Sequence, residues 1–358
     1  MASKGQAIAS KRQANFELLR IVAMLAIIAL HYMIKGDVAQ YSGRGWSPLY
    51  FVMQLSKALC IPLINCYVLL SGFFLAGAWW QPKRIVSLLA QILFYSLLIP
   101  LVMIGTGAVA WGDLGLYDWI GFLLPIGTEH YWFATAYLYM YIFAPVLAAG
   151  VQKLEKKTLQ RIIAVLLLFF AVEKSVVPVS LVMDQAGYDY GWFLCLFLIA
   201  AYWRRFGIEW LDRKKNGFCL YMLMCFGIWA FSAIIGMIVE RTGKLSYYEE
   251  QLYSYNHVFV LLASVGLFAA FKNIQIREGK AAEMIRRLAP YTFGVYLLHE
   301  HILVRYEWMG WLQIEKVRET WMFIPHMSVC ILLVYLVGTV TDFVRAYLFE
   351  GIHRKWRK

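Results

Sequence analysis

Long apolar runs recur along the whole of this 358-residue chain and leave no interval from which a water-soluble domain could be built. A helix that crosses a membrane needs about 20 mainly apolar residues. Backbone polar groups cannot remain unpaired in hydrocarbon, and these runs are far too long for the strands of a barrel. Charged residues make up only 16% of the chain, against about 25% in soluble proteins. The sequence therefore predicts an all-α, polytopic bundle in a membrane.

The runs predict about ten transmembrane helices. The sixth is short, and the second contains Pro62, which we expect to kink or break its helix because proline removes a backbone hydrogen bond. We expect a cytosolic segment over 1–16, a transmembrane domain over 17–345 and a basic cytosolic tail over 346–358. The predicted spans are 17–36, 50–78, 85–104, 130–150, 162–180, 190–203, 217–239, 256–271, 288–305 and 321–343.

The distribution of lysine and arginine predicts the orientation. Of the 34 basic residues, 25 lie in segments that share one side if the N-terminus is cytosolic, namely 4–20, 83–84, 153–161, 204–215, 272–287 and 345–358. Positive charge concentrates on the cytosolic side of membrane proteins, so both termini are expected there. The net charge of +12 lies on short loops that meet lipid headgroups, so we expect membrane lipids and no nucleic acid as partners. The predicted location is the cell membrane, the plasma membrane of a bacterium.

Two ionisable residues of the first span point to chemistry, because a charged group inside a membrane is costly and so favours a functional role. Arg20 lies about one turn into the helix. His31 follows 11 residues later, roughly 16 Å deeper and near the expected bilayer centre, on the same helical face. An arginine near the cytosol suits phosphate, and a histidine beyond it suits proton transfer or acyl attack. Alternatively, Arg20 extends to the headgroups and His31 is bonded to a neighbouring helix.

Four motifs resemble the membrane-bound acyltransferase-3 family. The first is NFELLR over 15–20 followed by His31, which resembles the Arg-x10-His pair of the family's first helix. The others are similar to its second helix, its His-x-Trp-Phe segment and its late Gly-x-Tyr-Leu-x-His helix. They read NCYVLLSGFFL over 65–75, HYWF over 130–133 with Pro145 further on, and FGVYLLH over 293–299.

The resemblance implies a ten-helix bundle that takes an acyl group from cytosolic acyl-CoA, with acetyl-CoA the first expectation. It implies that Arg20 binds the donor and that His31 is the catalytic residue. Many members have two arginines after the second helix, where this chain has only Lys83 and Arg84, so these two are the further candidates for donor binding. The implied acceptor is a glycan or lipid-linked sugar, which would make the reaction a modification of a cell-envelope polysaccharide.

Further polar residues complete the predicted site. His299 comes out at the depth of His31, and Tyr296 shares its helical face, so both are candidate catalytic residues. Asn65 and Glu173 also fall near mid-depth, and packing roles are the alternative for each. Glu129, His130 and Trp132 are expected at the acceptor entrance, the last two mainly through the family resemblance.

No metal site is predicted, because no span carries His-x-x-x-His or paired carboxylates, and His299, Glu300 and His301 should point around their helix. No permanently bound cofactor is expected. A transporter or flippase for a polar lipid or sugar is the alternative function, although such proteins are often built from two similar halves and none are visible here. The sequence predicts neither the identity of the acyl group nor that of the acceptor. It allows a homodimer, and it allows both direct transfer and transfer through a covalent acyl-enzyme.

Overall fold

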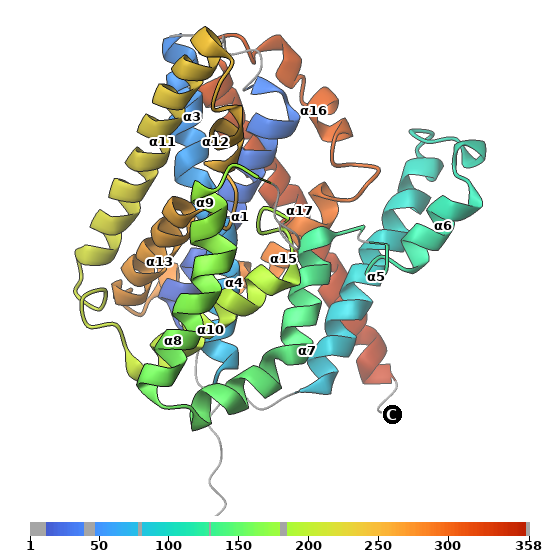
Figure 1. Ribbon diagram of the computed structural model, residues 1–358. Coiled ribbons are helices and arrows are strands. Elements are labelled where there is room, and N and C mark those ends of the chain that lie inside the picture. Colours follow the sequence, from blue (N-terminus) through green and yellow to red (C-terminus); the bar gives the residue numbers. More distant parts are fainter. Residues whose placement is uncertain (1–11, 39–46, 78–80, 129, 180–184, 356–358) are drawn as a thin grey trace, which may run out of the picture.

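A computed structural model describes residues 12–38, 47–77, 81–128, 130–179 and 185–355, and all regular secondary structure within them is helical (Figure 1). The helices are α1 (Ala14–Lys35), α3 (Pro48–Cys60), α4 (Pro62–Leu75), α5 (Pro82–Gly105), α6 (Leu116–Leu123), α7 (Trp132–Lys153), α8 (Lys156–Leu167), α9 (Glu173–Val176), α10 (Tyr190–Phe206), α11 (Asn216–Thr242), α12 (Ser246–Gln251), α13 (Val258–Asn273), α14 (Lys280–Leu288), α15 (Thr292–His299), α16 (Glu307–Trp311) and α17 (Phe323–Lys355).

Six helical stretches in the described residues are long and apolar enough to cross a membrane. They are Ala14–Lys35, Pro48–Leu75, Pro82–Gly105, Trp132–Lys153, Asn216–Thr242 and Phe323–Glu350. They match six of the ten predicted spans, and they make the chain a multi-pass membrane protein. The other four predicted spans fall on shorter or interrupted helices. One example is α13, which has only 16 residues.

The predicted helix over 288–305 is wrong as one continuous element. A 3-10 turn at Ala289–Tyr291 separates α14 from α15. Helix α15 then ends at His299, and the chain continues in turns to α16. Pro290 explains the first interruption, because proline cannot donate a backbone hydrogen bond inside a helix. The second interruption matters for the site. Because α15 ends at His299, Glu300 lies on the same side as His299, whereas a continuous helix would have turned the two residues away from each other.

The predicted break at Pro62 is confirmed, since α3 ends at Cys60 and α4 begins at Pro62. Proline is tolerated at the first position of a helix, where its missing N–H has no partner to lose. Gly72 of α4 lies against α10. A Cβ atom at this position would come within 2.9 Å of the Cα atom of Phe197. Glycine therefore allows the two backbones to approach closely, as small residues do between membrane helices.

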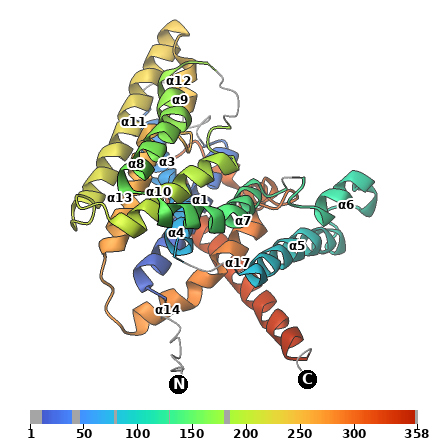
Figure 2. The same cartoon turned by 60° about the horizontal axis from the view of Figure 1, so that its bottom comes forward.

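Helix α1 lies at the centre of the bundle and contacts α3, α4, α13, α14, α15 and α17. Alanine, leucine, isoleucine and methionine favour a helix along its length, and the helix ends before Gly36, whose N–H bonds to the carbonyl oxygen of Tyr32. By contrast, α5, α11 and α17 lie at the periphery and expose many apolar side chains, as expected for lipid-facing helices (Figure 2). Helix α5 and the short α6 project away from the main body in Figure 1.

Several of the basic segments lie at one end of the molecule, where hydrogen bonds and an ion pair join their helices. Asn15 at the start of α1 bonds to the carbonyl oxygen of Phe271 at the end of α13. Lys272 pairs with Asp212 at 2.6 Å, and Arg205 at the end of α10 bonds to the carbonyl oxygen of Val151. The start of α1 and the end of α17 lie toward this same end in Figure 2. This clustering is what the charge distribution predicts for a cytosolic face.

Candidate active site

His31 and His299 meet in the structure although 268 residues separate them. The Nδ1 atom of His31 lies 3.0 Å from the Nε2 atom of His299. His31 is on α1, and His299 is the last residue of α15. The structure thus brings together two histidines that the helical rise predicted to lie at one depth. Within α1, His31 lies four residues before the last one, Lys35, so it is nearer the far end of the helix than the middle.

The hydrogen bonds of this pair determine which nitrogens carry protons. His299 Nδ1 lies 2.6 Å from the carbonyl oxygen of Val295, which can only accept, so this nitrogen is protonated and Nε2 of neutral His299 is an acceptor. His31 Nδ1 must therefore donate to His299 Nε2. Glu300 Oε1 lies 3.0 Å from the same nitrogen, where the carboxylate forms an ion pair with the ring once the ring is protonated. The remaining nitrogen of neutral His31, Nε2, is left unprotonated and available as a base or nucleophile.

Glu300 and Lys35 are site residues that the sequence analysis missed. Glu300 is 4% exposed, and its Oε1 atom contacts both His31 and the Lys35 ammonium group. Lys35 follows His31 by four residues, one turn along the same face. The spacing of Lys35 from His31 and the position of the Glu300 carboxylate in an apolar run could have indicated that both residues belong to the site. The sequence could not show that Glu300 would turn toward His31, because this depends on α15 ending at His299.

His31, His299 and Glu300 also form a group of possible metal ligands. Their ligand atoms lie within 4.8 Å of one another, whereas the sequence predicted no such grouping and no metal site. The candidate ligand atoms are already engaged with one another: His31 Nδ1 donates to His299 Nε2, and the Lys35 ammonium bonds to Glu300 Oε1. A protonated ring nitrogen has no lone pair for a metal ion. We therefore interpret the cluster as a set of proton-transfer groups, in which a buried carboxylate stabilises a histidine that becomes charged.

A small cavity of about 20 Å³ adjoins His31 and contains Tyr296 on its wall. This volume holds about one water molecule. The buried hydroxyl of Tyr296 makes no hydrogen bond of ordinary geometry among the described residues. The backbone N–H groups of Phe133 and Ala134 approach its oxygen, so the hydroxyl proton is free to bond to a ligand. Met24, Ile27 and Tyr67 extend the cavity wall toward Arg20, whose carbonyl oxygen accepts a 2.8 Å hydrogen bond from the Tyr67 hydroxyl.

Arg20 lies at the end of the molecule that gathers the basic segments. Its guanidinium group donates to both carboxylate oxygens of Glu17, at 3.0 and 3.1 Å. The pair is partly exposed on the arginine side, where 28% of the side chain remains accessible. Lys83 and Arg84 are both exposed at the start of α5. No contact in the described residues links these two to Arg20.

Trp132 forms a wall between the His31 cavity and a second cavity of about 440 Å³. The second cavity lies at the start of α7 and α10, at the end opposite the basic segments. Its rings are partly packed together, with Tyr188 at a centroid distance of 4.5 Å from Trp132. The lining combines aromatic rings with amide, hydroxyl and carboxylate groups; it includes Trp132, Tyr139, Tyr188, Tyr190, Gln185 and Asp189.

His130, the other described residue of the predicted acceptor entrance, does not line this cavity. His130 is 5% exposed, and its Nε2 accepts from the N–H of Ile302 while its carbonyl oxygen accepts from Arg305 at 2.6 Å. It therefore fastens the turn after α15, which carries Glu300, to the start of α7. Glu129 lies outside the described residues. Of the two described residues, His130 and Trp132, only Trp132 lines both cavities.

Asn65 and Glu173 are placed away from the histidine pair. Asn65 is buried, donates to the carbonyl oxygen of Tyr255 and to Ser264, and accepts from the indole of Trp192. These bonds occupy its amide in joining α4, α10 and α13, which favours the packing role. Glu173 begins α9 and lines neither cavity.

Comparison with known proteins gives one match. The acyltransferase-3 family profile, described as an acyltransferase domain, matches residues 13–342. No curated protein and no solved structure matches the chain. The matched region contains every described site residue discussed above, from Arg20 to Glu300. The chain therefore belongs to the acyltransferase-3 family of membrane acyltransferases.

Proposed function

We propose that this protein transfers an acyl group, with acetyl as the first candidate, from cytosolic acyl-CoA to a hydroxyl of a carbohydrate or other cell-envelope acceptor. The observation that carries the proposal is the contact between His31 and His299, whose geometry assigns the tautomer of His31. The His31 Nδ1–H bonds to His299 Nε2 with Glu300 Oε1 3.0 Å away, which leaves Nε2 as a base beside a cavity. Family membership favours an acyltransferase over the transporter alternative.

In the direct route, His31 acts as a general base. Its Nε2 removes the proton of the acceptor hydroxyl, the oxygen attacks the thioester carbonyl carbon, and the C–S bond breaks. The imidazolium then gives its proton to the departing sulfur. Glu300 stabilises the positive charge on the ring in the meantime, as a buried carboxylate does for a catalytic histidine. The Tyr296 hydroxyl supplies a hydrogen bond to the carbonyl oxygen as negative charge develops on it.

In the covalent route, Nε2 attacks the thioester itself. The N–C bond forms, the C–S bond breaks, and the acyl group stays on His31 while the thiolate leaves. The acceptor oxygen then attacks the acyl carbon, the C–N bond breaks, and the hydroxyl proton passes through the imidazole to solvent. This route allows the two substrates to bind in turn from opposite sides. Both routes use the same nitrogen and the same carboxylate.

The donor route begins at Arg20, which suits the phosphates of coenzyme A because a guanidinium group binds phosphate oxygens in a fork. Its bonds to Glu17 must then be exchanged for bonds to phosphate. The His31 cavity holds about one water, so a pantetheine arm must displace side chains to arrive. At the opposite end, the aromatic lining of the larger cavity suits the apolar faces of sugar rings, and its polar groups suit their hydroxyls.

The test uses purified protein in lipid nanodiscs with isotopically labelled acetyl-CoA. We expect binding of coenzyme A and label transfer to an envelope extract. His31→Ala should lose at least ~10²-fold of the transfer, as for other general bases, and should bind coenzyme A normally. His257→Asn is the matched control, because His257 caps α13 and asparagine is a good N-cap residue. Absence of both coenzyme A binding and transfer, or full transfer by His31→Ala, would refute the proposal.

A further inference from the structure

Arg305 is a partly buried arginine near the histidine pair that the proposed mechanism does not use. It lies in the turn between α15 and α16, where its Nη2 atom donates to the carbonyl oxygen of His130 at 2.6 Å. Its Nε atom is buried and makes no hydrogen bond with any described residue. A buried N–H donor without a partner is costly. The protein therefore holds one nitrogen of the guanidinium group and leaves another for a ligand.

Arg305 also lacks a counter-charge. The nearby cation Lys35 is paired with Glu300, whereas no carboxylate of the described residues forms an ion pair with Arg305. The charge of Arg305 acts on the ring of His31 and on Tyr296, which places its guanidinium group within electrostatic range of the reacting groups. While His31 is neutral, the site thus carries an excess positive charge. A desolvated cation without a partner is costly, and an anionic ligand would balance it.

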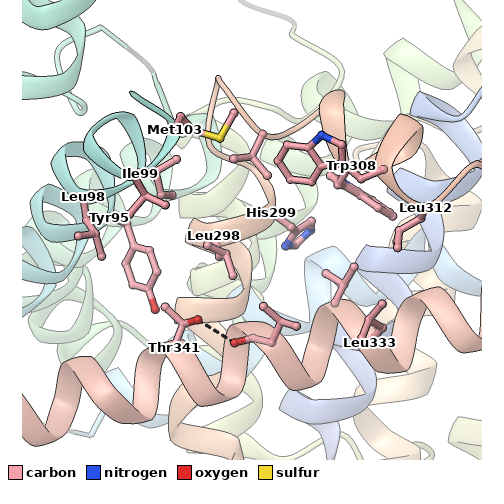
Figure 3. Close-up of a pocket in the computed structure, with 15 residues that line it drawn as sticks. Tyr95, Leu98, Ile99, Met103, Leu298, His299, Trp308, Leu312, Leu333 and Thr341 are labelled. Atoms are coloured by element: carbon pink, nitrogen blue, oxygen red, sulfur yellow. Dashed lines mark hydrogen bonds between the residues drawn. The ribbon is translucent and has the colours of Figure 1, made fainter. Parts of the chain in front are cut away.

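The apolar groove that His299 also lines offers nothing to an anion. Figure 3 shows this groove of about 420 Å³, whose walls come from α5, α15, α16 and α17. The hydroxyl groups in its wall are already committed. Tyr95 donates to Asp342, and Thr341 donates to a backbone carbonyl oxygen along the dashed line in the figure. The groove therefore does not compete with Arg305 for an anionic group.

The donor brings no anion to this position when the acyl group is acetyl. The phosphates of coenzyme A are assigned to Arg20, which lies 11 residues before His31 and roughly 16 Å away along α1, and a thioester is neutral. Arg305 lies at the other end of α1. The ammonium group of Lys35, the last residue of that helix, is 5.6 Å from the ring centroid of Tyr306. In the proposed function the acceptor arrives from this end.

From these observations we propose that the acceptor is anionic, and that Arg305 binds a carboxylate or phosphate group of the acceptor while the hydroxyl to be acylated lies at His31. A guanidinium group binds such oxygens through paired N–H donors. Arg305 is then a specificity residue, and it takes no part in breaking the thioester. The inference rests on the proposed function and adds the charge of the acceptor to it. An acidic acyl group or a lipid phosphate would offer Arg305 the same chemistry, and the experiments separate both from an acceptor.

The first experiment measures the charge preference of the wild type in a polyoxyethylene detergent, which carries neither phosphate nor sugar. Three probes compete with an envelope extract for label from acetyl-CoA: methyl glucoside, methyl glucuronide and methyl glucoside 6-phosphate. The last two add a carboxylate or a phosphate to the ring of the first. We expect at least one anionic probe to compete about tenfold better than methyl glucoside, the gain from one charged hydrogen-bonded contact. Equal competition by all three would overturn the inference.

The second experiment assigns this preference to Arg305. Arg305→Gln should remove it and raise the apparent KM for the extract about tenfold, while coenzyme A binding, the KM for acetyl-CoA and the maximal rate stay those of the wild type. Arg305→Lys keeps the charge but loses the fork, so it should retain part of the preference. Lys316→Gln is the matched control and should retain all of it, because it removes an exposed cation whose described hydrogen bond is to Gln313.

Three further outcomes would overturn the inference and leave the acyltransferase intact. An equal fall of the maximal rate with neutral and anionic probes in Arg305→Gln would place Arg305 with the reacting atoms or the fold. A preference for succinyl-CoA over acetyl-CoA that this variant abolishes would assign the contact to the acyl group. An effect of the variant confined to bilayers of phosphatidylglycerol would assign it to a lipid headgroup. Absence of any acetyl transfer by the wild type would instead refute the proposed function.

Discussion

The two ends of helix α1 differ in how their ionisable side chains are paired. Near its start, Arg20 is neutralised by Glu17, three residues away on the same helix. Near its end, the partners of His31 come from α15 and from the residue after it, 268 and 269 residues further along the chain. The first pair is local, partly exposed and easily exchanged for a ligand. The second is buried and fixed by the fold. This difference suits a site for substrate binding at one end and for proton transfer at the other.

The largest effect should come from removing the charge that stabilises His31. Glu300→Gln keeps the size of the side chain but loses the negative charge beside Nδ1. We expect acyl transfer to fall about a hundredfold or more, because an imidazolium no longer has a buried counter-charge. Glu17→Gln is the matched change at the other end of α1. At saturating acetyl-CoA it should leave the transfer rate nearly unchanged, because Glu17 contacts Arg20 and not the reacting atoms. Rates measured in nanodiscs with labelled acetyl-CoA test the pair, and equal losses in both variants would contradict the contrast.

The next effect should appear in donor binding. Arg20→Lys keeps the charge but loses the planar fork that binds two phosphate oxygens. We expect binding of coenzyme A to weaken by ~1–3 kcal/mol, the range for one charged hydrogen-bonded contact, with the fold intact. Isothermal calorimetry measures this directly. Unchanged affinity in both Arg20→Lys and Arg20→Ala would exclude Arg20 from the donor site.

A smaller effect, on stability alone, is expected where the structure favours packing over substrate binding. Asn65→Ala removes an amide that bonds to Tyr255, Ser264 and Trp192. We expect a loss of ~1–3 kcal/mol in stability, because buried partners are left unsatisfied. Thermal unfolding in detergent measures it. The Michaelis constants for donor and acceptor should stay those of the wild type, and a raised acceptor constant would return Asn65 to the substrate site.

The orientation of the bundle in the membrane is tested by cysteine labelling, which does not depend on an activity measurement. In a Cys219→Ser background, which removes the exposed native thiol, Arg213→Cys should be labelled only after the cytosolic face is opened. Lys244→Cys, beyond the other end of α11, should be labelled in intact cells by an impermeant maleimide. The reason is the concentration of basic residues at the end that holds residue 213. The reverse pattern would invert the bundle and place the donor site outside.

Sequence reasoning reached the parts of the site that depend on one helix at a time. The spacing from Arg20 to His31 and the shared depth of His31 and His299 follow from the rise of an α-helix, and the structure brings the two histidines into contact. The break at Pro62 follows from the chemistry of proline. The family resemblance, which the profile match confirms, added the proposed order from donor to acceptor.

What sequence reasoning missed depends on where helices end and which ends meet. A continuous helix over 288–305 would have turned Glu300 away from His299, but α15 stops at His299 and Glu300 turns toward His31. His130 was expected at the acceptor entrance, yet it is buried and holds the turn after α15. The apolar groove lined by Tyr95, His299 and Leu333 is formed by helices that are distant in sequence, and no single segment predicts it.

The most direct test of the account is the protonation pattern of His31 in the resting protein. Nitrogen-15 NMR of protein with labelled histidine in nanodiscs, assigned with His31→Gln, distinguishes a protonated nitrogen from an unprotonated one. The account predicts a neutral His31 ring with its proton on Nδ1 and a bare Nε2, and a changed Nδ1 signal in Glu300→Gln. A His31 ring that carries its proton on Nε2, with an Nδ1 signal insensitive to Glu300, would contradict it, because the nitrogen assigned to the chemistry would then have no lone pair to offer.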